Sequence, residues 1–371
     1  MQNLRLFDSN RGEVQPFKSL TQGKVKMYVC GVTPYATNHL GHIFVFTHFD
    51  ILWRVLELLE YDVKYVQNVT DIDQPLFKKA REEGKDWKDL AQYWVDYMLE
   101  DFNSLGIKRP NNFIYASDNL DSMIKVIERL VEKGYGYSAG GNIYFDTKKY
   151  NHYGDNIKAD YAELLELSGG EYGGQDNSDP NKIDPLDFPL WIGEENMEKE
   201  DPKFLAPWGS GMPGWHIECS SMIIKHLGEQ IDIHGGGYDL RFPHHGAEIA
   251  QSQAYSGKKP FVNFWMHAAM VKYEGHKISK SRGNLVSVQE IIQQYDPKLL
   301  RFYLAINHYR EEWEFSYESL DAAKEKFEQI ETSIQKLSDT KITKQEILGS
   351  ELLQSTMLND LNIGKLVDQI E

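Results

Sequence analysis

Cysteine is scarce in this sequence, since the 371 residues include only Cys30 and Cys219. Two cysteines cannot build a disulfide framework, so we expect a reducing compartment, the cytoplasm. The sequence also lacks an apolar run of about 18 residues, the length that a membrane-spanning helix needs. Its first residues show no basic stretch followed by an apolar one, which argues against a signal peptide. We therefore expect no membrane partner.

Positive charge is also in short supply. The chain has 40 lysines and arginines against 56 aspartates and glutamates, a formal net charge of -16. Bulk attraction to nucleic acid grows with the number of neutralised phosphates, so this charge counts weakly against a nucleic-acid substrate. It leaves room for a local basic groove. The hydrophobic share of 41% is ordinary for a globular protein, and this length allows two or three domains.

The early part of the chain alternates between two kinds of apolar pattern. Residues 24–31 form a short apolar run that ends in glycine, typical of a buried strand. Residues 43–59 are mostly apolar, with polar side chains recurring at helical spacing. Residues 62–67 have the pattern of a second strand. This order predicts a right-handed βαβ unit in a parallel sheet, with ligands beyond the carboxyl ends of the strands.

The remainder of the chain divides by composition. Residues 87–105 and 119–133 have helical patterns, whereas residues 136–205 are rich in Gly, Asp, Asn and Tyr. We interpret this polar stretch as an insertion that interrupts the nucleotide fold. Residues 230–234 predict another strand, and the sequence becomes helical from residue 286. The result is an α/β pattern with a helical end.

Two histidines flank Leu40-Gly41 at the predicted strand-to-helix junction, as His39 and His42. The glycine lets a nucleotide approach the backbone, and the helix N-terminus favours negative charge. Imidazoles there can donate hydrogen bonds to a phosphate in the transition state. A pair of structural histidines would explain this short motif about equally well, because such motifs recur by chance.

A basic loop changes that balance. Lys277-Ile278-Ser279-Lys280-Ser281 carries two ammonium groups and is followed by a glycine. Such a loop can close over a triphosphate and stabilise the departing pyrophosphate. A solvated basic loop is the plain alternative. Found together with the histidine motif, it favours ATP chemistry. Nucleotidylyltransferases, which share a His-x-Gly-His element, remain an alternative on these two motifs alone.

The two cysteines and a His/Glu pair suggest a metal site. Cys30 ends the first predicted strand, and Cys219 ends the segment Gly214–Cys219. His244 and Glu248 are spaced to lie on one face of a helix. Thiolate, imidazole and carboxylate are all ligands of Zn²⁺. Each residue alone could be structural, but their joint position near strand ends favours a zinc site, which a nucleotidylyltransferase would not need.

These motifs carry a resemblance to a known family. The pairing of His39–His42 with Lys277–Ser281 resembles the two signatures of class I aminoacyl-tRNA synthetases, with Leu40 and Ile278 as apolar departures. Across essentially residues 1–365 the chain is similar to cysteinyl-tRNA synthetases and their close relatives. The matching stretches are Met27–Gly31, Tyr65–Asp73, Pro213–Cys219, His234–Leu240 and Phe242–His245.

The resemblance implies an α/β fold: a Rossmann-like parallel-sheet catalytic core with an inserted connective segment and a C-terminal helical region. The implied parts are the two halves of the catalytic domain at 1–125 and 206–285, the connective insertion at 126–205, and a helical domain at 286–371. In such synthetases the helical region continues into an anticodon-binding part, which we expect to be missing or shortened here.

The resemblance also implies a role for each matching residue. The catalytic residues would be His39, His42, Lys277 and Lys280. ATP would contact His39, Gly41, His42, Gly235, Gly236, Gly237, Asp239 and Lys280, with Mg²⁺ bound to the nucleotide. The cysteine pocket would include Gly31, Thr70 and Trp215. One zinc ion per chain would be held by Cys30, Cys219, His244 and Glu248. A zinc ion selects cysteine over serine because sulfur is the softer ligand.

The acceptor of the activated cysteine has more than one reading. We expect transfer of L-cysteine to tRNA(Cys), on the strength of Glu248 and the helical region. The alternative is a small amine, because the chain also resembles the ligase of the mycothiol pathway that joins cysteine to glucosaminyl-inositol, for example at Val32–Tyr35 and His308–Arg310. That ligase family generally lacks the glutamate. A silent paralogue that only binds a partner is a third reading, opposed by the intact ATP motifs.

Overall fold

The computed structural model describes residues 4–170, 175–278, 283–337 and 342–370. Its centre is a parallel sheet with the strand order β12-β11-β3-β4-β5. The strands are β3 (Lys24–Val32), β4 (Asp62–Val69), β5 (Asn112–Tyr115), β11 (Ile231–Gly237) and β12 (Val262–Ala268). The predicted strands at 24–31, 62–67 and 230–234 are confirmed, each to within three residues at either end.

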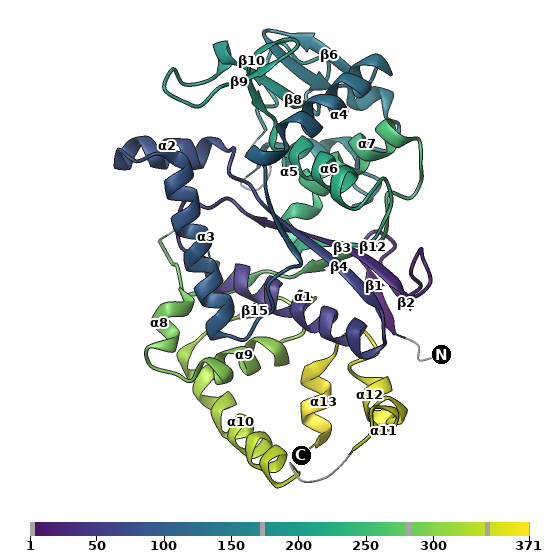
Figure 1. The fold of residues 1–371 in the computed structure, drawn as a ribbon, viewed down its shortest axis with the longest axis vertical. Helices are drawn as coiled ribbons and strands as arrows, with labels where there is room; N and C mark the ends of the chain where they lie inside the picture. Colours follow the sequence, from purple (N-terminus) through teal and green to yellow (C-terminus); the bar gives the residue numbers. More distant parts are fainter. Residues whose placement is uncertain (1–3, 171–174, 279–282, 338–341, 371) are drawn as a thin grey trace.

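Helix α1 (Leu40–Leu58) crosses from β3 to β4 and is buried along most of its length. Its apolar side chains pack between the sheet and α9 (Pro297–Ile306), which explains why few polar residues interrupt the run. In Figure 1, α1 lies below the sheet, while α6 (Trp215–His226) and α7 (His244–Ser256) lie above it. The parallel sheet is therefore covered on both faces, as the βαβ pattern predicts.

The polar stretch after residue 135 forms an antiparallel sheet of its own, at the top of Figure 1. Its strand order is β6-β7-β8-β10-β9, and each strand runs antiparallel to its hydrogen-bonded neighbours. The strands are β6 (Gly136–Ala139), β7 (Asn142–Phe145), β8 (Phe188–Gly193), β9 (Phe204–Ala206) and β10 (Gly209–Pro213). The last strand lies beyond residue 205, directly before α6.

The remaining helices before the C-terminal part are α2 (Gln74–Glu83), α3 (Trp87–Ser104), α4 (Leu120–Glu132) and α5 (Tyr161–Gly169). Short 3-10 turns occur at Ser117–Asn119, Thr147–Lys149, Glu194–Asn196 and Tyr238–Arg241. The helices expected at 87–105 and 119–133 are confirmed as α3 and α4. A hairpin of β1 (Arg5–Asp8) and β2 (Glu13–Pro16) lies beside β12.

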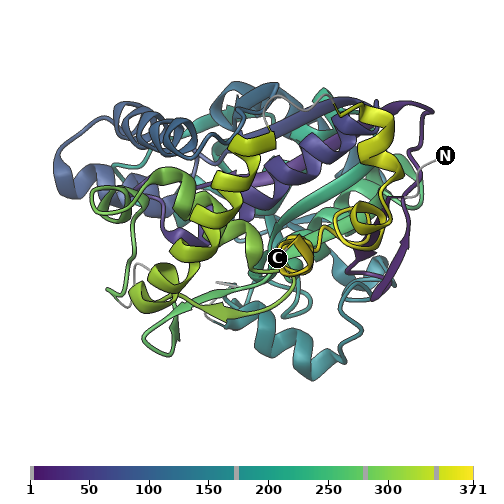
Figure 2. The ribbon, with the colours of Figure 1, turned by 90° about the horizontal axis from the view of Figure 1, so that it is seen from below.

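The C-terminal part is mainly helical, as expected. It contains α8 (Val288–Ile292), α9, α10 (Tyr317–Leu337), α11 (Lys344–Gly349), α12 (Glu351–Ser355) and α13 (Ile363–Ile370). One short strand, β15 (Trp313–Glu314), interrupts it and pairs with β13 (Val271–Tyr273), which also pairs with β14 (His276–Lys277). Figure 2 shows these helices from below, over α1. Within the described ranges, no helix combines the length and apolarity that crossing a membrane requires.

Candidate active site

A cavity of about 370 Å³ opens at the carboxyl ends of β3 and β11. Eight of the predicted site residues line it: Cys30, Gly31, His39, Gly41, His42, Gly237, Asp239 and Lys277. Ligands of parallel α/β sheets bind at this end of the strands. The cavity therefore has the position that the sequence predicts for a nucleotide.

The two histidines of the first motif stand at the start of α1. His39 is the N-cap residue, and its ring stacks on that of His42 with 3.7 Å between the centroids. A Cβ at Gly41 would lie only 3.0 Å from two atoms of the His39 ring. Glycine therefore lets the helix backbone pass close to the imidazole, and a larger residue would require the ring to shift by a few tenths of an ångström. Both rings thus face the cavity from a helix N-terminus, where negative charge is stabilised.

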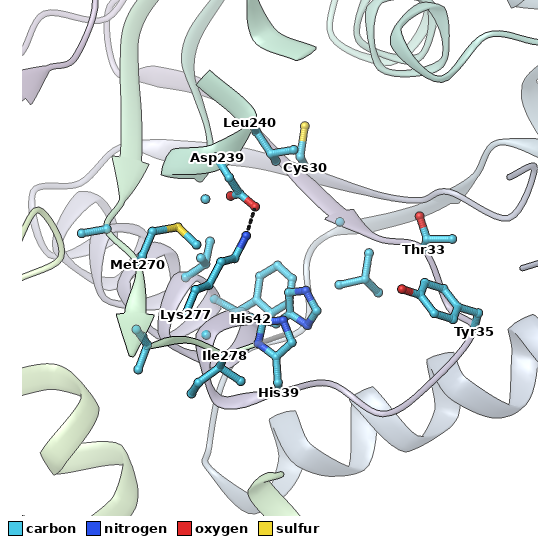
Figure 3. Close-up of a pocket in the computed structure, with 18 residues that line it drawn as sticks. Cys30, Thr33, Tyr35, His39, His42, Asp239, Leu240, Met270, Lys277 and Ile278 are labelled. Atoms are coloured by element: carbon cyan, nitrogen blue, oxygen red, sulfur yellow. Dashed lines mark hydrogen bonds and ion pairs between the residues drawn. The ribbon is translucent and has the colours of Figure 1, made fainter. Parts of the chain in front are cut away.

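Lys277 reaches into the cavity from β14 on the opposite side. Its ammonium lies 3.0 Å from Oδ2 of Asp239, which stands at the start of the turn after β11. Figure 3 shows this ion pair (dashed) above the two stacked imidazoles, with Thr33 and Tyr35 on the other side of the cavity. The predicted catalytic residue Lys280 lies outside the described residues, together with its neighbours 279, 281 and 282.

The three glycines at the carboxyl end of β11 have different surroundings. A Cβ at Gly235 would lie 2.0 Å from Cζ of Phe49, so this glycine allows α1 to pack against the strand. A Cβ at Gly236 would lie 2.8 Å from Leu240. Of the three, Gly237 is the one that lines the cavity.

The expected cysteine pocket lies beside Cys30. Thr70 is buried at the end of β4, and its hydroxyl accepts a hydrogen bond from Asn68, whose side-chain oxygen accepts one from the Gly31 amide. Trp215, at the start of α6, stacks on the ring of His244 with 4.2 Å between centroids. Gly31 lines the cavity, whereas Thr70 and Trp215 are not among the residues that line it.

The four predicted metal ligands come together as one buried cluster. Cys30, Cys219, His244 and Glu248 each present one ligand atom, and these atoms lie within 4.8 Å of one another. Cys30 Sγ lies 3.8 Å from Cys219 Sγ, 3.6 Å from His244 Nε2 and 3.7 Å from Glu248 Oε1. His244 Nε2 is 3.0 Å from Glu248 Oε1. Helix α7 places the last two residues on one face, as their spacing predicts.

These distances fit a tetrahedral zinc ion. Bonds of about 2.3 Å to sulfur and about 2.0–2.1 Å to nitrogen and oxygen separate tetrahedral ligand atoms by about 3.4–3.8 Å. The three distances from Cys30 fall in this range, and the His244–Glu248 pair would need to open by a few tenths of an ångström. Two thiols, an imidazole and a carboxylate are also ligand types that zinc prefers.

The electrostatics of the cluster agree with a cation site. Burial raises the pKa of Glu248, but His234 and His244 outweigh burial and bring this pKa down to about 2. Burial likewise raises the pKa of the Cys219 thiol, yet hydrogen bonds with Cys30 and His244 lower it to about 6. Burial lowers the pKa of His244, whereas Cys219 and Glu248 raise it to about 10. Without an ion, the proton on His244 offsets part of the negative charge of Glu248 and Cys219, and a divalent cation would take the place of that proton.

Further histidines, for which the sequence predicts no role as ligands, surround the four predicted ligands. His234, in the middle of β11, lies 2.7 Å from Glu248 Oε2 through its Nε2. His216 Nδ1 lies 2.9 Å from His244 Nδ1. His245 Nδ1 lies 2.7 Å from His267 Nε2. His234 and the pair His244-His245 lie apart in the sequence, and only the fold brings them together. Thr33, Tyr35 and Met270 also line the cavity, and the sequence predicts no site role for any of them.

Comparisons with known proteins identify the family. Residues 16–325 match the family model described as tRNA synthetases class I (C) catalytic domain. The chain is 39% identical over 363 residues to a cysteine–tRNA ligase of Idiomarina loihiensis, covering 97% of this chain and 76% of that protein. It is 42% identical over 336 residues to a cysteine–tRNA ligase of a Geobacillus species, covering 90% of this chain and 69% of that protein.

A third relative and two solved structures complete the picture. A cysteine–tRNA ligase of Methanococcus maripaludis is 40% identical over 334 residues, which cover 90% of this chain and 68% of that protein. Methionyl-tRNA synthetase of Mycobacterium tuberculosis with methionyl-adenylate has a TM-score of 0.69 at 16% identity, over 94% of this chain and 81% of that chain. A putative arginyl-tRNA synthetase of Campylobacter jejuni has a TM-score of 0.55 at 13% identity, over 95% and 83%. These structures support the fold, and the chain belongs to the cysteine–tRNA ligase family of class I aminoacyl-tRNA synthetases.

Proposed function

We propose that this chain activates L-cysteine with ATP to form cysteinyl-adenylate and transfers the cysteine to tRNA(Cys). One observation carries the proposal. Cys30 belongs to the buried cluster of soft ligands and also lines the cavity that the two histidines and Lys277 line. A site for a thiol therefore opens into a site for a phosphate chain. Joining the carboxylate of cysteine to the α-phosphate of ATP requires two such adjoining sites.

ATP binds at one end of the cavity. His39 and His42 donate hydrogen bonds to the α-phosphate at the N-terminus of α1, where charge develops as the cysteine carboxylate attacks. Lys277 exchanges its partner Asp239 for the phosphates, and we assign the pyrophosphate contact to Lys280 as well. Gly237 and Asp239 contact the nucleotide on the side of the cavity opposite the two histidines. Mg²⁺ accompanies ATP and its pyrophosphate product.

The cysteine side uses the other end. Gly31, Thr70 and Trp215 surround the amino acid, and Cys30, Cys219, His244 and Glu248 hold one zinc ion per chain. When bound, zinc supplies a soft Lewis acid that favours a substrate thiolate over an alcohol, which explains selection against serine. The protein residues themselves orient the carboxylate toward the ATP end. We assign this activity to the cytoplasm, because charged tRNA is used in translation.

Transfer of radiolabelled cysteine to total tRNA, run beside cysteine-dependent exchange of pyrophosphate into ATP, tests this function. We expect both activities, with charging abolished when the tRNA has been oxidised at its 3′ end. Adenylate formation without charged tRNA would exclude tRNA as the acceptor. Absence of cysteine-dependent exchange would defeat the activation step itself. A Lys280→Ala variant should lose exchange much more than cysteine binding.

A further inference from the structure

A second set of four ligand atoms overlaps the first. Cys30, His234, His245 and Glu248 each present one donor atom within 4.8 Å of the others, and all four residues are buried. The two sets share Cys30 and Glu248. The second set has His234 and His245 where the first set has Cys219 and His244. No motif in the sequence indicates this second set.

The shared residues face both sets at once. Glu248 divides its oxygens: Oε1 lies 3.0 Å from Nε2 of His244, and Oε2 lies 2.7 Å from Nε2 of His234. Cys30 Sγ lies 3.6 Å from Nε2 of His244 and 3.4 Å from Nε2 of His245. An ion could therefore pass from one set to the other while it keeps the same thiolate and the same carboxylate.

Contacts fix both additional imidazoles in place, and His245 is held in the manner of a metal ligand. His245 hydrogen-bonds through Nδ1 to His267, 2.7 Å away, and His267 in turn hydrogen-bonds to Ser9, 2.6 Å away. A ligating histidine is commonly fixed through its other ring nitrogen in this way. His234 stacks on Trp265 with 4.6 Å between centroids, just as His244 stacks on Trp215. Both rings are thus oriented by their packing.

The geometry of the second set is close to that of a tetrahedral site. The Cys30–His245 distance of 3.4 Å is near the separation of about 3.6 Å that zinc imposes on sulfur and nitrogen. The 2.7 Å between His234 and Glu248 is shorter, so the carboxylate must turn slightly when an ion enters. The set has one thiolate where the first has two, and zinc should therefore prefer the first set when Cys219 is available.

We propose that Cys30, His234, His245 and Glu248 form a second, overlapping position for a soft divalent cation such as Zn²⁺, occupied by the same single ion in alternation with the first. Two dications at once would repel strongly across a few ångströms of buried space. The second position retains the ion in the protein when a ligand of the first is lost. The inference rests on the proposed function only for the expectation that the natural ion is zinc.

Zinc-edge X-ray absorption and metal analysis of the full chain, loaded with zinc alone, test this position. Wild type should hold one ion with two sulfurs and one imidazole. The variant Cys219→Ser/His244→Asn, which keeps the second set complete, should retain at least half of the zinc, now with one sulfur and two imidazoles. The matched control His234→Asn/His245→Asn should keep the wild-type coordination.

Three results would overturn the proposal. One is a folded Cys219→Ser/His244→Asn chain with less than a tenth of the wild-type zinc, and another is two ions per wild-type chain. If this double variant does not fold, the single variant Cys219→Ser tests the proposal instead. Two imidazoles bound to its zinc ion would support the second position. A single imidazole would be the third contrary result. Metal coordination is read without activity, so failure to charge tRNA would defeat the proposed function and leave this inference standing.

Discussion

Cys30 is the single thiol that both ligand sets use, so its loss removes a ligand from both positions. We expect Cys30→Ser to lower the zinc content of the purified chain at least tenfold after dialysis against submicromolar zinc, because serine is a harder and less acidic ligand. Cysteine binding should weaken in parallel. Ser221→Ala, a buried change whose hydroxyl bonds only the backbone of Glu218, serves as the control. Unchanged zinc in Cys30→Ser would remove this thiol from the site.

His48 gives a residue-scale prediction about pH. It is fully buried in α1, its Nδ1 lies 3.0 Å from the Phe44 carbonyl, and burial lowers its pKa from 6.5 to about 4. The unfolded chain therefore binds a proton in the window between pH 6.5 and 4 that the folded chain does not bind. Stability is fully present above pH 6.5 and is lost as the pH falls through this window.

The size of this effect is measurable by urea unfolding. From pH 7 to pH 5, His48 should cost the wild type about 2 kcal/mol of unfolding free energy. His48→Gln carries no such titration, so its stability should fall less over the same interval, even though it starts from a lower value. Equal pH slopes in the two proteins would show that His48 titrates normally in the folded chain.

At the scale of elements, the pairing of β3 with β4 sets the geometry of the site. The register shifts between Val29 and Val32, and Gly31 sits at this irregularity. A Cβ added there would lie 1.7 Å from the backbone oxygen of Asn68. Backbone cannot move aside as a side chain can, so the two strands would have to separate where they carry Cys30 and Thr70.

We therefore expect Gly31→Ala to lower the unfolding free energy by about 1–3 kcal/mol and to weaken cysteine binding as well. Urea denaturation and isothermal titration with cysteine measure the two effects. Gly349→Ala is the matched control, since a Cβ at that position would meet nothing within 4 Å. Its stability should be unchanged or slightly raised, because alanine favours helices. Wild-type stability in Gly31→Ala would mean that the strands tolerate the side chain.

The elements also differ in how far sequence predicts them. β3, α1 and β4 follow from apolar periodicity because each is long and buried. The insertion sheet does not, since its strands have only three to six residues and are interrupted by the glycines and aspartates that turns require. Strand β15 has two residues and exists only through its pairing with β13.

The same reasoning applies to the site. The ligands Cys30, Cys219, His244 and Glu248 come together as expected. Chemical type marks all four, the end of a strand marks Cys30, and helical spacing marks His244 and Glu248. His234 and His245 were passed over as ligands. His234 lies within a strand and His245 follows an already assigned histidine, so nothing local indicates a metal. Their shared position depends on the packing of α7 against the end of β11, which a single sequence does not contain.

At the scale of the whole molecule, Asp360 ties distant parts of the chain together. Its Oδ1 accepts hydrogen bonds from the Phe7 amide at 2.8 Å and the Tyr309 hydroxyl at 2.5 Å, and its Oδ2 accepts one from Arg310 at 2.6 Å. The Asp360 amide donates to the Arg5 carbonyl at 2.9 Å. One carboxylate, only 3% exposed, thus joins the β1–β2 hairpin, the segment before β15 and the C-terminal helices.

Replacing this carboxylate should loosen the C-terminal helices without touching the site. Asp360→Asn keeps one acceptor oxygen but loses the charge that Arg310 requires, so we expect a loss of about 1–3 kcal/mol in unfolding free energy. Hydrogen exchange should accelerate first in residues 351–370, because that segment has few other anchors to the hairpin. Asp368→Asn removes only an exposed ion pair with Lys326 and should change stability by less than about 0.5 kcal/mol. Uniformly faster exchange across the central sheet in Asp360→Asn would instead mean that the chain unfolds as one cooperative unit.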